Sequence, residues 1–295
     1  MRAIFQHELR GAFHGLAAYL FCAFLLVFVG VGAMIYNIQA AVANFEYVLQ
    51  FVCIGLVVIV PVLTMRSFAE ERRQKTDQLL YSLPLGTWDI VAGKYLALVA
   101  GKYLALVTVF LVPMVFISAY PLLFSLYGEV YLPSAYGSLL AFLLLGAALI
   151  AAGIFVSSLT ESQGFAAGIA IAAFLLNYYS VSLAEQVSAT ALGSLLALGV
   201  TALLLALLIR ALTRNAALAW GVGGVCALAA LAVYLIDAAK LEGLLPTLME
   251  KLSLFERFYP FVNGIFDWTS VVFYGSVIVF FLFLTVMSLE KRRYN

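Results

Sequence analysis

Charged side chains are scarce in this 295-residue chain. Asp, Glu, Lys and Arg make up 11% of the residues, whereas hydrophobic residues make up 65%. All fifteen Asp and Glu residues fall outside the long apolar runs that divide the sequence. A pump or a proton-coupled carrier needs an ionisable group inside the bilayer to sense its driving ion. The sequence therefore disfavours a secondary carrier, and any uphill transport must take its energy from another subunit.

The residues of enzyme active sites are also missing. The two histidines, His7 and His14, precede the first apolar run, which disfavours an intramembrane hydrolase or acyltransferase. No phosphate-binding loop occurs, because Ala92–Tyr95 lacks both the glycine framework and the hydroxyl of that motif, so the chain is not itself an ATPase. The three cysteines lie inside apolar runs without metal-ligand spacing: Cys22, Cys53 and Cys226. We expect no catalytic, cofactor or metal site in this chain and no nucleic-acid partner, although the net charge of +1 itself says nothing about nucleic acid.

Long apolar runs are what the sequence does contain. An uncharged stretch of about 18 or more residues can cross the hydrocarbon core as a helix, and the alternating pattern of a membrane barrel is absent. Eight runs qualify: Leu16–Ile35, Tyr47–Met65, Tyr103–Tyr127, Tyr136–Leu159, Phe165–Leu183, Ala191–Ile209, Ala216–Ile236 and Val271–Leu289. The sequence predicts an all-α fold, a polytopic transmembrane helical bundle of about eight spans, built as one domain over residues 1–295.

The basic residues orient this bundle. With both termini inside, the inner segments hold Arg2, Arg10, Arg66, Arg72, Arg73, Lys75, Lys94, Arg210, Arg214, Lys291, Arg292 and Arg293. The outer segments hold Lys240, Lys251 and Arg257, and Lys102 is ambiguous. Twelve, three and one account for all sixteen Lys and Arg residues, and the excess inside predicts cytoplasmic N- and C-termini in a cell inner or plasma membrane.

Three segments outside the spans carry the remaining signal. Residues 1–15 predict an interfacial elbow helix, with Phe5, Leu9 and Phe13 on one side. Residues 66–102 form the longest inner segment, and nothing breaks a helix between Arg66 and Leu83. Two interpretations of that helix stay open: a solvated loop helix, or a docking element for a cytosolic partner, which its charges of both signs favour.

The third segment, residues 237–267, predicts an amphipathic or re-entrant helix on the outer side. Apolar residues recur there at helical spacing, and four of them form a candidate outer gate: Leu244, Leu248, Leu252 and Phe255. A plain outer cap fits the same pattern. The sequence does not separate the cap from the gate.

A perfect tandem copy of VAGKYLAL occupies Val91–Leu98 and Val99–Leu106. Eight residues lengthen a helix by about 12 Å. If Lys94 lies at the inner interface, Lys102 lies deeper and must snorkel or face protein. The alternative, which we favour, is that the membrane begins near Tyr103 and the first copy extends the helix into the cytosol.

The same third span contains two prolines, Pro113 and Pro121, which predict a bend.

The charged inner segment resembles a known family. Its matching residues are Met65–Arg73, Thr76, Leu79, Leu80, Leu83, Pro84, Gly93 and Lys94, and near the C-terminus Leu254–Phe258, Gly264, Asp267, Phe283–Thr285 and Leu289–Arg293. Together these are similar to permeases of the type-two ABC exporter class, with GldF-like and NosY-like permeases as the nearest match. About residues 187–236 add a pair of spans to the six-span core that this resemblance implies.

The resemblance implies the function of a permease subunit that moves a substrate with ATP hydrolysed elsewhere. Its partners would be a cytosolic ABC ATPase, which binds ATP and Mg, a second permease chain as homo- or heterodimer, membrane lipids and an extracytoplasmic accessory subunit. The ATPase-coupling interface would comprise Arg66, Phe68, Glu70, Glu71, Arg72, Arg73, Thr76, Leu79 and Leu80. The alternative from another class is a membrane scaffold that recruits cytosolic proteins without transporting.

Overall fold

Helices make up every regular element of the described chain. The structure is a computed structural model, and it describes residues 6, 9–11, 13, 16–73, 88–186, 190–213, 216–236 and 241–293. These ranges contain no strand, so the predicted all-α fold is confirmed for them. Five of their helices are long and apolar enough to cross a membrane, and a bent pair adds a sixth if it is counted as one span. The count of eight spans and the side of each terminus stay predictions.

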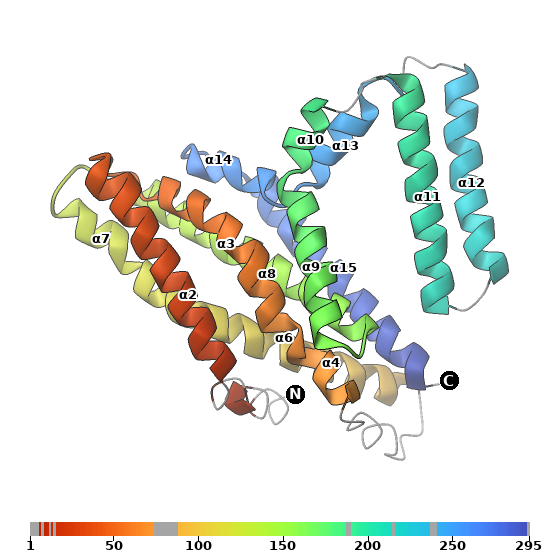
Figure 1. Cartoon of the computed structure of the whole chain (residues 1–295), viewed down its shortest axis with the longest axis horizontal. Helices are drawn as coiled ribbons and strands as arrows, with labels where there is room; N and C mark the ends of the chain where they lie inside the picture. The colour runs from red at the N-terminus through yellow and green to blue at the C-terminus, as the bar shows by residue number, and fades with distance from the viewer. Residues whose placement is uncertain are drawn as a thin grey trace. The chain divides into compact units, whose positions relative to one another are not determined.

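The helices follow the predicted runs closely (Figure 1). Their bounds are α2 Leu16–Gly32, η1 Ala33–Gln39, α3 Glu46–Thr64, α4 Arg66–Arg73, α6 Trp88–Ile117, α7 Ala119–Ser125, α8 Leu132–Leu159, α9 Gln163–Tyr178, α10 Ser180–Gln186, α11 Ala191–Thr213, α12 Ala216–Ile236, α13 Leu244–Leu252, η3 Glu256–Phe258, α14 Tyr259–Val262 and α15 Trp268–Arg293. Of the predicted elbow helix, the described residues 6, 9–11 and 13 are helical.

The chain divides into two compact units, where the sequence predicts one domain. The first comprises Met1–Leu175 together with Arg257–Tyr294, and the second comprises Leu176–Glu256. Each unit is described below by itself.

The core of the first unit is α8. Its span is 78% buried, whereas the spans of α2 and α15 are 33% and 28% buried. The helices α3, α6 and α15 pack around it. Small residues permit the close approach, since a Cβ at Gly146 would collide with the Phe110 ring and one at Gly153 would collide with Thr64. The large apolar side chains that α2 and α15 expose suit contact with lipid.

Two spans of the first unit are irregular. The third breaks at Ser118, between α6 and α7, three residues before Pro121. A proline lacks the N–H of a helical hydrogen bond and crowds the preceding turn, which accounts for the break before Pro121, whereas α6 continues through Pro113. The first span ends in a π-helix, η1.

The second unit contains a helix pair and the second part of a broken helix, whose first part, α9, lies mostly in the first unit. The pair, α11 and α12, packs closely enough that a Cβ at Gly223 would lie 2.7 Å from the Cβ of Ala206. The broken helix is the predicted fifth span. It bends by 56° between α9 and α10, at Tyr179.

Candidate functional site: the start of α4

The predicted coupling helix begins where the sequence places it. The second span, α3, ends at Thr64, and α4 starts one residue later, after Met65. The inner end of α3 contains Pro61, which cannot donate a helical hydrogen bond. At the junction itself the N–H of Met65 bonds to the Pro61 carbonyl at 2.8 Å, and side chains of neighbouring helices hold the start of α4.

Ser157 of α8 is the first of these side chains. Its Oγ accepts hydrogen bonds from the backbone N–H groups of Phe68, at 3.1 Å, and Ala69, at 3.2 Å. It also lies 3.1 Å from the carbonyl oxygen of Met65, to which it donates. The first N–H groups of a helix lack intrahelical partners, and a capping side chain normally comes from the same segment. Here the cap comes from another helix, so α4 is fastened to α8, the core of the unit.

Lys102 of α6 is the second side chain that holds the start of α4. Its Nζ donates a hydrogen bond of 2.8 Å to the carbonyl oxygen of Ser67 and lies 4.7 Å from the centroid of the Phe68 ring. The side chain is only 1% exposed. A cation over an aromatic ring is attracted by its negative face, and the attraction increases where water is excluded. The alternatives of snorkelling and facing protein are thus decided for Lys102, because it faces protein.

Close packing of α3 against α8 also supports the junction between α3 and α4. Thr64 is buried, and its Oγ donates within its own helix to the carbonyl of Val60 at 3.0 Å. It lies against Gly153, four residues before Ser157, at a position where any larger residue would collide with it. We call the set of Thr64, Lys102, Gly153 and Ser157 the α4 anchor.

The structure describes the predicted interface residues to different extents. Arg66 is exposed, whereas Phe68 is only 2% exposed, so its ring contacts the bundle. The backbone of Glu70, Glu71, Arg72 and Arg73 continues α4, and their side chains lie outside the described residues. Thr76, Leu79 and Leu80 also lie outside them.

The candidate gate residues do not share one environment in the second unit. Leu252 is 62% exposed at the end of α13, whereas Phe255 is buried, with its ring centroid 5.1 Å from that of Tyr178. Leu244 is half-buried and Leu248 is exposed. The four residues therefore differ in exposure, from the buried Phe255 to the exposed Leu252.

Asn177 holds the end of α13. Its Nδ2 donates to the carbonyl of Leu252 at 3.2 Å, and its Oδ1 accepts from the backbone N–H of Leu254 at 2.9 Å. The hydroxyl of Ser253 donates to the Asn177 carbonyl at 3.2 Å. Ser194 of α11 holds the other end by accepting from the N–H of Leu245 at 3.3 Å. The predicted outer helix is thus fixed at both ends within its unit.

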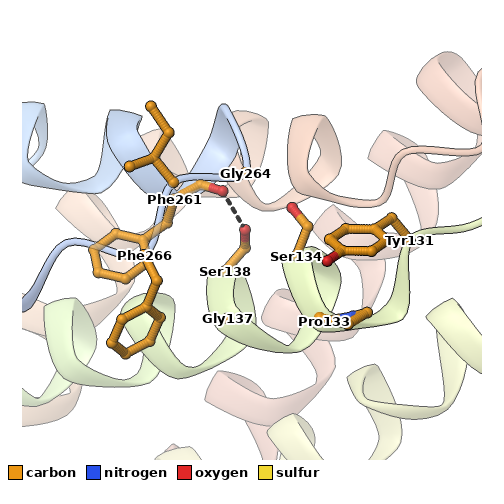
Figure 2. A pocket seen from close by; sticks show the side chains of 9 residues that line it. Tyr131, Pro133, Ser134, Gly137, Ser138, Phe261, Gly264 and Phe266 are labelled. Carbon is orange, nitrogen blue, oxygen red and sulfur yellow. Dashed lines mark hydrogen bonds between the residues drawn. The ribbon is translucent and has the colours of Figure 1, made fainter.

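A small pocket lies in the first unit, between the start of α8 and the segment around Gly264 (Figure 2). Its volume is about 190 Å³. The Ser138 hydroxyl donates to the Phe261 carbonyl at 2.8 Å, and Gly264 adopts a φ of +76°, where an added Cβ would lie 3.3 Å from Ser134 Oγ. No charged side chain lines the pocket. These contacts serve to join α8 to the segment before α15.

The chain stands apart in the comparisons. No protein-family model, curated protein or solved structure matches it. The described residues also contain no group of three or more His, Cys, Asp or Glu side chains that could hold a metal ion. The α4 anchor joins the short polar helix α4 to α8 and α6 of the first unit.

Proposed function

We propose that this chain is the membrane-spanning permease subunit of an ABC transporter, which moves a substrate using ATP hydrolysed by a separate cytosolic ATPase. The observation that carries the proposal is the α4 anchor, in which Ser157 and Lys102 hold the first turn of α4 against α8 and α6. A helix that passes a partner's motion into a bundle must be joined firmly to the spans that it moves. A solvated loop helix has no such requirement.

The docking surface in this proposal follows the anchored turn. Glu70, Glu71, Arg72 and Arg73 pair with charges on the ATPase, and Thr76, Leu79 and Leu80 add contact area. Phe68 acts from inside, because its buried ring lies against Lys102 and keeps the helix seated. Arg66, exposed at the first position of α4, is available to the partner.

The resemblance to type-two exporter permeases supports the same assignment. It also supplies the remaining parts of the proposal, which are a second permease chain, a multi-pass location in the inner or plasma membrane with cytoplasmic termini, and an accessory subunit outside.

Reversal of charge on α4 tests the proposal. The chain is co-expressed with a candidate cytosolic ABC ATPase, the complex is purified and reconstituted in vesicles, and ATP hydrolysis is measured. The double substitution Glu70→Lys and Glu71→Lys should abolish co-purification or the stimulation of hydrolysis. Arg210→Glu, a charge reversal at an exposed site in the last turn of α11, is the control and should leave both intact.

The same assay separates a transporter from a scaffold, which would also need a fixed docking helix. A scaffold binds the ATPase without changing its turnover, whereas a permease changes it. Unchanged binding and unchanged hydrolysis in the α4 double variant would show that α4 is not the docking element.

A further inference from the structure

Two buried side-chain oxygens without partners lie where the first two spans join. They are Oδ1 of Asn37, in η1, and Oε2 of Glu46, in the first turn of α3. The two side chains are 8% and 5% exposed. A buried carboxylate that lacks a compensating charge or hydrogen bond is among the costliest groups in a folded protein. Each of these oxygens therefore requires a partner that the described side chains do not supply.

The chain between the two residues brings them into one neighbourhood. Nδ2 of Asn37 donates to the carbonyl of Val42 at 2.6 Å and to that of Asn44 at 3.3 Å. Asn44 precedes Glu46 by two residues, so the loop folds over the Asn37 amide on its way into α3. Ala41 has a φ of 54°, a left-handed conformation that is uncommon for a residue other than glycine and that turns the loop back.

The hydrogen bonds also fix the chemistry that the site presents. Both partners of the Asn37 amide nitrogen are carbonyl oxygens, so rotating the amide would set oxygen against oxygen. Its Oδ1 is therefore an acceptor, like Oε2 of Glu46, so each of the two oxygens needs a donor or a cation as its partner. In addition, the last turn of a helix leaves carbonyl oxygens without intrahelical partners, and the first span ends in this loop.

Aromatic side chains pack beside Glu46. Phe45 is fully buried, and its ring stacks on that of Tyr120 with centroids 5.6 Å apart. The π-helical turn of η1, seven residues long, is itself a form that occurs mainly at functional sites.

We propose that Asn37 and Glu46 are ligands of an alkali-cation site at the join of the first two spans, with loop and helix-end carbonyls completing the coordination. Carboxylate and carbonyl oxygens are the ligands that hard cations prefer. One carboxylate carries one negative charge, so a monovalent ion leaves the site neutral, whereas a divalent ion leaves an uncompensated positive charge. The site binds the cation independently of any ATPase partner.

The test is thermal unfolding of the purified full-length chain in detergent, in sodium, potassium or choline chloride at equal ionic strength. A cation that binds only the folded state raises the unfolding temperature, by roughly 5 °C or more at a hundred times its dissociation constant. We expect a saturable rise with sodium or potassium and none with choline, and the ion that acts at lower concentration is the preferred ligand.

Glu46→Gln should abolish this rise and unfold at a higher temperature than the wild type in choline, because it removes a buried charge and keeps the shape. Glu46→Asp keeps the charge on a shorter side chain and should shift the response to higher salt. Glu242→Gln, at an exposed site, should respond as the wild type does. An equal response to all three salts, an undiminished rise in Glu46→Gln, or stabilisation by lower pH alone would overturn the proposal.

Discussion

Replacement of Ser157 by alanine tests whether α4 is held by a cap from α8. The substitution removes one oxygen atom and no other contact group, yet that atom accepts from the N–H groups of Phe68 and Ala69 and donates to the Met65 carbonyl. Ser157 is fully buried, so water does not readily replace it. The substitution therefore removes all three of these hydrogen bonds at once.

The size of the effect follows from these bonds. Loss of a helix cap costs typically about 1 kcal/mol, and a buried donor left unsatisfied costs roughly 1–3 kcal/mol. Together we expect the docking of α4 on α8 to weaken by about 2–4 kcal/mol. Since about 1.4 kcal/mol corresponds to a factor of ten, the amides of Phe68 and Ala69 should exchange their hydrogens roughly 30- to 700-fold faster if they exchange by local opening.

Ser158 provides a closely matched control for Ser157. It is the next residue of α8 and equally buried, but its hydroxyl donates only within its own helix, to the Phe155 carbonyl at 2.7 Å. Ser158→Ala removes the same atom and brings the same change in helix propensity. Hydrogen exchange of the peptide covering α4, followed by mass spectrometry in lipid nanodiscs, should accelerate in Ser157→Ala and stay within tenfold of the wild type in Ser158→Ala. Equal exchange in the two variants would refute the anchoring argument.

Three further substitutions probe other contacts. Gly153→Ala should lower the unfolding temperature, because the new Cβ meets Thr64 and overpacking costs about 1–3 kcal/mol, whereas Gly168→Ala, with nothing within 4 Å, should be neutral or stabilising. Hydrogen bonds from Ser270, then from Thr269, lower the pKa of the Asp267 carboxyl from 3.8 to about 2, so its stabilisation of α15 is complete above pH 4 and lost as the pH falls toward 2; Asp267→Asn should flatten that part of the pH profile in acid unfolding followed by circular dichroism. Asn177→Leu should free the end of α13, and limited proteolysis should then cut near Leu252 faster than in Thr201→Leu.

Hydropathy predicts most of the helices because a spanning segment is defined by its own composition. The run Tyr136–Leu159 became α8, and the helix expected from Arg66 begins at that residue as α4. Hydropathy does not predict the bend at Tyr179, because the apolar run continues through it to Leu183 without a proline. In the third span α6 continues through Pro113 and ends four residues before Pro121, and the predicted bend of that span stays a prediction.

The α4 anchor could not be predicted from the sequence for a different reason. A single serine in an apolar run has no periodicity, and its partners, at Met65, Phe68 and Ala69, lie about 90 positions away. The available signals were indirect: two adjacent serines, Ser157 and Ser158, at the end of an otherwise apolar span. Glu46 escaped because it adjoins a span, where a carboxylate is normally solvated, and only the folded loop shows that it is buried.

Lys102 gives the tandem copy a structural meaning. Two lysines eight residues apart on one helix differ by about 12 Å along its axis and by about 80° around it. Lys94 therefore cannot stand in for Lys102 at the Ser67 carbonyl without a shift of α6 by that distance. One lysine of the pair carries the anchor, and the copy that precedes it lengthens α6 back to Trp88. In the described part of the chain, α4 is bound to α6 through Lys102 of the second copy and to α8 through Ser157. Under the proposed function, a displacement of α4 by the partner would reach the bundle through these two side chains.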